Sequence, residues 1–174
     1  MIVIVVGTNR PNAVSKQIAA YYQYLLSQHG QKSMLLDLEN LPDDFTKTAL
    51  YLNSGKNEAF NQLKKVMEDH HKFVFVIPEY NGSFPGVLKA FIDGLKYPDS
   101  MLNKKAALVG VSTGVQGASL ALSHFSDVLS YLNVNQIGLQ VKLGSIKQHL
   151  QEGKITFDIY NQLLEKQIQQ LLVF

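Results

Sequence analysis

The sequence predicts an α/β fold in which helices cover both faces of a five-stranded parallel sheet. Segments typical of strands alternate with segments typical of amphipathic helices along the whole chain of 174 residues. Several of these strands are apolar throughout, which indicates burial on both faces and therefore parallel pairing. No internal repeat, low-complexity tract or linker interrupts the alternation. We therefore expect a single domain over residues 1–174.

The first half of the chain predicts three strands and two helices. The strands are MIVIVV (1–6), KSMLLDL (32–38) and KFVFVI (72–77). Apolar residues recur at helical spacing between them, first at Ile18, Ala19, Tyr22, Leu25 and Leu26, and then at Ala59, Phe60, Leu63 and Met67. We expect Gly30 to end the first helix. Residues 39–57 lack either pattern and predict an irregular loop.

The second half continues the alternation with two strands and three helices. The strands are KAALVGVS (105–112) and the weaker VNQIGLQVK (134–142). Three helix faces are predicted beside these strands. The first precedes both strands and contains Val87, Leu88, Phe91, Ile92 and Leu95, and the second lies between them and contains Ala121, Phe125, Val128, Leu129 and Leu132. The third follows near 157–172 and contains Tyr160, Leu163, Leu164, Ile168 and Leu171.

The expected strand order is 2-1-3-4-5, the flavodoxin-like arrangement of a three-layer α/β/α sandwich. In such sheets a ligand binds outside the carboxyl ends of the strands, where the strand order reverses. That point lies between strands 1 and 3. The loops after strands 1, 3 and 4 are GTNRPNAVSK, PEYNGSFPG and STGVQGA, and all three fall at this edge. We therefore expect them to form one ligand site.

The loop GTNRPNAVSK predicts a phosphate site. It contains many donors, and the start of the next helix adds free N–H groups and a positive dipole end. Arg10 is the only arginine in the chain, and its planar guanidinium matches a phosphate. The loop has neither the GxxxxGK[ST] nor the GxGxxG spacing, which favours a single monophosphate over a dinucleotide. The alternative interpretation is ordinary capping of the helix by Asn12 or Ser15.

The loop PEYNGSFPG predicts a slot for a flat ring. Tyr80 supplies an aromatic face, Gly82 allows the backbone to approach closely, and small polar groups lie beside them. An isoalloxazine ring needs such an apolar slot with backbone donors and acceptors along its pyrimidine edge. The alternative is a wide turn before a helix that begins at Pro85. STGVQGA is small and contains glycine, so its backbone can also approach a ring.

A competing motif overlaps the third loop. GVSTG (110–114) fits the G-x-S-x-G pattern of a serine hydrolase, and Asp127 and His149 follow in the order that such enzymes use. The pattern is short, and no HGGG-type oxyanion loop is visible. A serine hydrolase that uses Ser112 therefore remains the weaker alternative.

Composition excludes several other classes. The chain has no cysteine, so disulfides, thiolate metal sites and cysteine nucleophiles are excluded, and any redox chemistry needs a bound cofactor. The net charge is +2, and no basic stripe with interleaved aromatics indicates nucleic acid. No apolar run approaches the ~20 residues of a membrane span. The opening segment lacks the basic start of a signal peptide, which favours a cytoplasmic protein.

Three segments together, GTNRPNAVSKQIA, PEYNGSFPGVLKAFID and VGVSTGVQGA, resemble the NADPH-dependent FMN reductase family over roughly residues 1–135. That family is flavodoxin-like and includes quinone, azo and chromate reductases. The resemblance implies an enzyme that passes hydride from NADPH or NADH through bound FMN to a small-molecule electron acceptor. Members are usually homodimers or homotetramers, which here would employ the helices at 87–95 and 118–132.

The resemblance also implies site residues. The FMN phosphate would be bound by Thr8, Arg10, Ser15, Lys16 and Gln17. The flavin ring would be cupped by Pro78, Glu79, Tyr80, Asn81, Gly82 and Ser83, and its other edge lined by Ser112, Thr113, Gly114 and Gly117. Tyr80 would flank the site, and no side chain is assigned a catalytic step. A non-catalytic FMN-binding or electron-carrier protein remains an alternative, although the mildly basic charge is unlike the acidic surface of such carriers.

Overall fold

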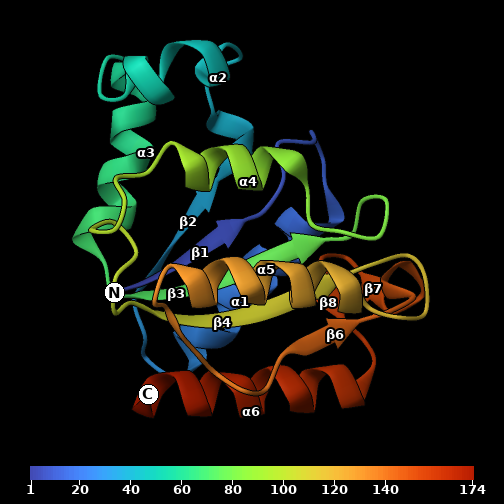
Figure 1. Cartoon of the computed structure of the whole chain (residues 1–174). Coiled ribbons are helices and arrows are strands. Elements are labelled where there is room, and N and C mark those ends of the chain that lie inside the picture. Colours follow the sequence, from blue (N-terminus) through green and yellow to red (C-terminus); the bar gives the residue numbers. More distant parts are fainter.

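The computed structural model describes residues 1–174 and has a central sheet in the order β2-β1-β3-β4-β5. All four pairs of neighbours in this order are parallel, which confirms the predicted topology. The strands are β1 (Ile2–Val6), β2 (Ser33–Asp37), β3 (Lys72–Pro78), β4 (Lys105–Val111), β5 (Asn135–Gln136) and β6 (Val141–Leu143). In Figure 1 the arrows of β1, β3 and β6 point to the right, so the carboxyl ends of these strands lie there, and both chain termini lie at the opposite side.

Helices cover both faces of the sheet, as the apolar strands require. One face is covered by α1 (Val14–Gln28) and α6 (Asp158–Val173), and the other by α3 (Glu58–Asp69), α4 (Gly86–Asp93) and α5 (Ser119–Tyr131). Alternation along β1 divides its side chains between these layers: Val3 and Val5 join a cluster of 26 buried residues, and Ile4 and Val6 join one of 20. No helix is both long enough and apolar enough to span a membrane.

The fifth predicted strand is divided into two short strands. Both β5 and β6 pair with β4, and after Ile137, whose N–H still donates to the Ala106 carbonyl, the chain leaves the ladder until β6. Gln167 of α6 is fully buried at this gap. Its side-chain amide donates to the carbonyls of Leu108 at 2.9 Å and Leu139 at 2.7 Å. Tyr22 of α1 donates its hydroxyl to Oε1 of Gln167 at 3.2 Å, and burial raises the pKa of this tyrosine. Side chains thus replace ladder bonds that buried carbonyls need.

Two regions have more structure than the sequence predicts. Residues 39–57 contain the short helix α2 (Phe45–Thr48) and two 3₁₀ turns, η1 (Leu38–Asn40) and η2 (Tyr51–Asn53). Beyond β6, the chain forms the 3₁₀ turn η3 (Ile146–Gln148) and a hairpin of β7 (Leu150–Gln151) and β8 (Lys154–Ile155). The turn η3 lies at the carboxyl edge of the sheet, beside the end of β4.

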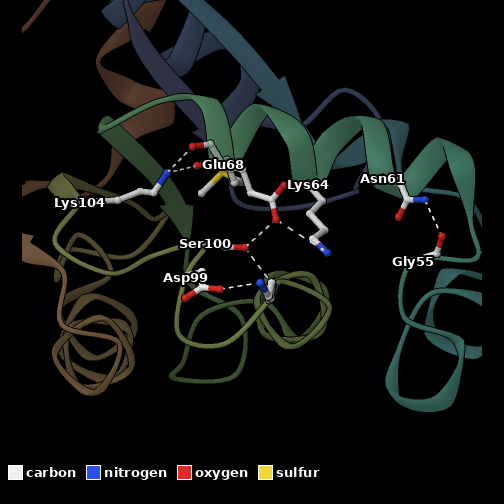
Figure 2. A network of polar contacts seen from close by, with 9 residues as sticks. Gly55, Asn61, Lys64, Glu68, Asp99, Ser100 and Lys104 are labelled. Carbon is white, nitrogen blue, oxygen red and sulfur yellow. Dashed lines mark hydrogen bonds and ion pairs between the residues drawn. The ribbon is translucent and has the colours of Figure 1, made fainter.

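The helices that end at the amino edge of the sheet have their last carbonyls satisfied. Lys104 is buried, and its Nζ donates to the carbonyls of Met67, Glu68 (3.0 Å) and His70 (2.6 Å) at the end of α3. Figure 2 shows this side chain reaching the last turn of the helix. Lys72 donates to the carbonyls of Leu171 and Leu172 in α6 at 3.0 and 3.1 Å. These lysines also place a positive charge at the negative end of each helix dipole.

Candidate cofactor site

A cavity of about 410 Å³ lies at the carboxyl edge of the sheet, where strands 1, 3 and 4 end. The three loops that the sequence singles out meet here, together with η3. The lining residues are Arg10, Pro11, Asn12, Ala13, Val14, Ser15, Pro78, Glu79, Tyr80, Val111, Ser112, Thr113, Ile146 and Lys147. The topology therefore brings the predicted phosphate loop and the predicted ring loops to one cavity.

The start of α1 at this cavity is left without a cap. Its N-cap residue is Ala13, which has no side-chain acceptor, and Asn12 does not supply one. Ser15 is 1% exposed, and its hydroxyl has no hydrogen-bond partner. The N–H groups of Val14 and Ser15 precede the first intrahelical bonds. Capping by Asn12 or Ser15, the alternative to a phosphate site, is therefore not what the structure shows.

Arg10 completes a cluster of unused donors beside this helix start. Its guanidinium lines the cavity and forms no ion pair or hydrogen bond within the chain. Its backbone N–H donates to the hydroxyl of Thr8 at 3.2 Å, and that hydroxyl is also 3.0 Å from the Tyr80 hydroxyl. Thr8 is buried and thus ties the first loop to the second. A free guanidinium, an unpartnered hydroxyl and a helix N-terminus together suit a phosphate dianion.

The second loop is a tight turn that presents Tyr80. The backbone groups of Tyr80 and Ser83 exchange hydrogen bonds of 2.8 and 3.1 Å. Asn81 and Gly82 between them have φ of 53° and 74°, the signature of a type I′ turn, for which Asn-Gly is the preferred pair. Ser83 Oγ lies 2.9 Å from Nδ1 of His124 on α5. Gly82 is therefore needed for the turn itself.

The third loop is held against β6 and η3. Ser112 donates its N–H to Leu143 at 3.1 Å and its hydroxyl to the Gly114 carbonyl at 2.7 Å. Gly117 has φ of 60°, and a Cβ there would lie 2.7 Å from the carbonyl carbon of Lys142, so only glycine fits. A second hollow of about 440 Å³ opens between this loop and the second one, lined by Glu79, Asn81, Ser112, Thr113, Gly114, Val115 and Gln116.

Three residues of the predicted phosphate set, Thr8, Lys16 and Gln17, do not line the cavity. Lys16 is exposed on α1, and its Nζ lies 2.8 Å from carboxylate oxygens of both Asp37 and Glu39. The hydrogen bond to Asp37, followed by that to Glu39, raises the pKa of Lys16. Gln17 is also exposed on α1. Their proposed contacts with phosphate remain predictions. The ammonium of Lys16 already forms ion pairs with the two carboxylates.

The turn η3 also contributes to the cavity, although the sequence does not predict it. Ile146 and Lys147 line the same cavity as the phosphate loop. Backbone bonds from Ile146 N to the Ser112 carbonyl, 3.1 Å, and from Ser145 N to the Gly114 carbonyl, 2.8 Å, hold the turn there. No local motif marks these residues, because their position depends on β6 pairing with β4.

The residues of the alternative hydrolase motif are not assembled. The Ser112 hydroxyl donates to a backbone carbonyl rather than to a base. His149 stacks on Phe157 with ring centroids 4.7 Å apart, and Asp127 lines a separate groove between α4 and α5. The three residues therefore do not form a relay. No group of three or more His, Cys, Asp or Glu residues is placed to hold a metal ion.

The chain matches a protein-family model and several curated relatives. The model of the NADPH-dependent FMN reductase family matches residues 1–148. A 2-hydroxy-1,4-benzoquinone reductase from Burkholderia sp is 31% identical over 150 residues, which cover 81% of this chain and 78% of the relative. An NAD(P)H-dependent FMN reductase from Pseudomonas aeruginosa is 32% identical over 121 residues, which cover 67% of this chain and 65% of the relative.

Solved structures share the fold at lower identity. A flavoenzyme NAD(P)H:(acceptor) oxidoreductase from Paracoccus denitrificans superposes with a TM-score of 0.82 at 23% identity, over 99% of this chain and 94% of that one. An FMN-dependent NADH-azoreductase from Bacillus anthracis, in complex with FMN, superposes with a TM-score of 0.66 at 11% identity, over 98% of this chain and 99% of that one. These likenesses support the fold that the strand order defines.

Proposed function

The chain belongs to the NADPH-dependent FMN reductase family, and from this membership we infer that it is an FMN-dependent NAD(P)H oxidoreductase whose flavin lies in the cavity between Arg10 and Tyr80. The single observation that supports this placement best is the uncapped start of α1. Ser15 keeps a buried hydroxyl with no partner there, and a buried polar group without a partner costs about 1–3 kcal/mol. A ligand oxygen would satisfy it.

The donors fit FMN in particular. FMN ends in one phosphate, and the free donors gather around one point, namely Arg10, Ser15 and the first N–H groups of α1. The loop lacks the glycine spacing with which a dinucleotide pyrophosphate is bound. We propose that these groups hold the phosphate and that Thr8 supports them from behind through its bonds to Arg10 and Tyr80.

The ring would lie between the second and third loops. We propose that Pro78, Glu79, Tyr80, Asn81, Gly82 and Ser83 cup it and that Ser112, Thr113, Gly114 and Gly117 line its other edge. FMN, when bound, supplies the redox chemistry by accepting hydride from NAD(P)H and giving it to the acceptor. The chain's own groups orient the ring and exclude water. Glu79 is the only carboxylate that lines the cavity, and we assign it no proton transfer.

We propose quinones, azo compounds and flavins as the class of electron acceptor. This proposal rests on the names of the relatives, which include a benzoquinone reductase and an FMN reductase. We further expect donor and acceptor to use one ring-sized slot in turn. A single slot predicts ping-pong kinetics, in which NAD(P)⁺ leaves before the acceptor binds.

We also propose that residues 1–174 act as one cytoplasmic domain that self-associates as a dimer or tetramer. One sheet carries both hydrophobic clusters. The groove between α4 and α5 has an apolar lining, and the rings of Tyr97 and Tyr131 stack at its rim while 63% and 73% exposed. Such a surface is typical of an interface. Sedimentation of the protein would measure the oligomeric state.

The test of the proposed function is reconstitution followed by kinetics. The protein with added FMN should show oxidised-flavin absorption, and FMN should bind more tightly than riboflavin. Oxidation of NADPH or NADH with a quinone acceptor should give parallel lines in double-reciprocal plots. Bound FMN without NAD(P)H oxidation would favour a non-catalytic flavin-binding protein. No detectable binding of FMN would contradict the proposed function altogether.

A further inference from the structure

Lys147 is a cation in the cavity that no phosphate contact explains. It follows Ile146 in η3, and backbone bonds hold this turn to Ser112 and Gly114 in the third loop. Lys147 is an exposed residue of the cavity lining, and its ammonium forms no ion pair or hydrogen bond within the chain. The other titratable groups in the lining are Arg10, Glu79 and Tyr80. The cavity therefore has two free cations on different loops and one carboxylate.

The two cations come from different segments of the cavity lining. Arg10 is in the loop before α1, beside the unpartnered Ser15 hydroxyl, where the single phosphate is expected. Lys147 is joined instead to the loop of Ser112, which is expected to line the flavin ring. A phosphate already has a guanidinium, a hydroxyl and a helix N-terminus at the first position. Lys147 is thus available to a second negative charge.

The flavin ring acquires such a charge on reduction. Hydride transfer adds two electrons and one proton at N5 and leaves NAD(P)⁺, so the reduced ring has one negative charge more than the oxidised ring. That charge is delocalised over N1 and the C2 carbonyl. N1 lies on the same side of the ring as the ribityl chain, whereas N5 lies on the opposite side. With the phosphate held beside Arg10, the ribityl chain would direct the N1 side of the ring toward the cavity that Arg10 and Lys147 share.

We propose that Lys147 lies beside N1 and the C2 carbonyl and favours reduced over oxidised FMN. The inference rests on the proposed function, because it requires FMN in this cavity. Charged groups near N1 are a recognised means by which proteins tune flavins. Arg10 acts differently: it binds the phosphate, whose charge is the same in both redox states. Arg10 therefore sets affinity, and Lys147 sets the preference between the two states.

The experiment compares dissociation constants of oxidised and dithionite-reduced FMN, measured anaerobically for wild type, Lys147→Met and Lys147→Arg. In Lys147→Met the preference for reduced FMN should fall about tenfold, which is about 30 mV in the two-electron potential. Riboflavin should show the same loss of preference, because it keeps N1 and lacks the phosphate. Lys147→Arg should keep most of the preference. Lys154→Met is the matched control, since it removes the same charge from an exposed position on β8.

Each other outcome overturns the proposal. An unchanged ratio in Lys147→Met would mean that Lys147 does not contact the reduced ring. Equal weakening of both FMN states with no effect on riboflavin would place Lys147 on the phosphate. The same shift in Lys154→Met would indicate long-range charge alone. A wild-type protein that binds FMN in neither state would instead contradict the proposed function itself, so the two failures are distinguishable.

Discussion

The two edges of the sheet differ in whether the helix ends there are hydrogen-bonded by other groups of the chain. At the amino edge, Lys104 closes the end of α3, Lys72 donates to the carbonyls of Leu171 and Leu172 in the last turn of α6, and Lys105 donates to the main-chain oxygen of Phe174. The end of α1 is closed by Gly30, whose φ of 67° allows the Schellman bonds from Gly30 N and Gln31 N. At the carboxyl edge, the N-cap residues of α1, α4 and α5 are Ala13, Pro85 and Ala118, and none of these helices has a side-chain cap.

This difference separates stability from function. A good N-cap contributes about 0.5–2 kcal/mol, and Asn57 provides one for α3 by accepting from Phe60 N at 3.0 Å. The helices around the cavity forgo that contribution. Beside them, the Ser15 hydroxyl is buried without a partner, and Arg10 has no counter-ion. We infer that the amino edge is built for stability and that the carboxyl edge keeps its donors free for a ligand.

The largest effect is expected at the amino edge. Lys104→Met should lower the free energy of unfolding by about 3–4 kcal/mol, because several buried carbonyls lose a charged donor at once. FMN affinity of the folded protein should not change. Urea unfolding and a flavin titration measure the two quantities. Lys65→Met, which removes an exposed lysine from the same helix, is the control and should cost less than about 0.5 kcal/mol. A loss of FMN affinity in Lys104→Met would break the distinction between the edges.

Arg10→Ala should have the converse effect. Loss of a charge-assisted hydrogen bond of roughly 1.5–3 kcal/mol predicts FMN binding about 10- to 150-fold weaker, with little change in stability. Arg10→Lys should fall between, since it keeps the charge but lacks the planar fork. Riboflavin affinity should be unchanged in both variants when followed by fluorescence quenching. Equal losses for FMN and riboflavin would show a disturbed fold rather than a lost phosphate contact.

A substitution in the interior between the two edges should lower the free energy of unfolding, as a substitution at the amino edge does. Tyr22→Phe leaves Oε1 of Gln167 buried without its donor, which predicts a loss of about 1–2 kcal/mol at neutral pH. Burial raises the pKa of Tyr22, so the folded protein keeps a proton that the unfolded chain loses above about pH 10. Stability present below that pH therefore falls as pH rises.

The alkaline limb isolates this tyrosine. Unfolding free energies between pH 8 and 11 should fall less steeply in Tyr22→Phe, by up to about 1.4 kcal/mol per pH unit for one proton. Other titrating groups, such as Tyr21 and Lys104, are the same in both proteins. Their contributions therefore cancel when the two pH profiles are subtracted. Parallel pH profiles for the two proteins would mean that Tyr22 is not held neutral by the core.

The sequence alone predicted those features that depend on local pattern. The apolar runs of β1, β3 and β4 required burial on both faces, and their order put three loops at one edge. Arg10 was identified because it is the only arginine and precedes a helix. Asn81 and Gly82 had a local signal for a type I′ turn, which was interpreted instead as room for a ligand.

Features that depend on distant partners were not predictable. VNQIGLQVK has the pattern of one strand, and the gap between β5 and β6 is satisfied by Gln167, far along the chain. The ion pairs of Lys16 with Asp37 and Glu39 at the end of β2 had no local signal in the phosphate loop. Lys147 enters the cavity only because η3 is bonded to the loop after β4.

The smallest expected effect tests the central claim most directly. Ser15→Ala removes the buried hydroxyl that has no partner and places a better helix former in the first turn of α1. The FMN-free protein should become more stable by about 0.5–1 kcal/mol, while FMN binding should weaken about 5- to 10-fold. Ser27→Ala, at the other end of α1, where the hydroxyl already donates to Tyr24, is the control and should leave FMN affinity unchanged. Urea unfolding without FMN, paired with an FMN titration, gives both numbers. A less stable FMN-free protein with unaltered FMN affinity would contradict the account, because Ser15 would then serve the fold and not the ligand.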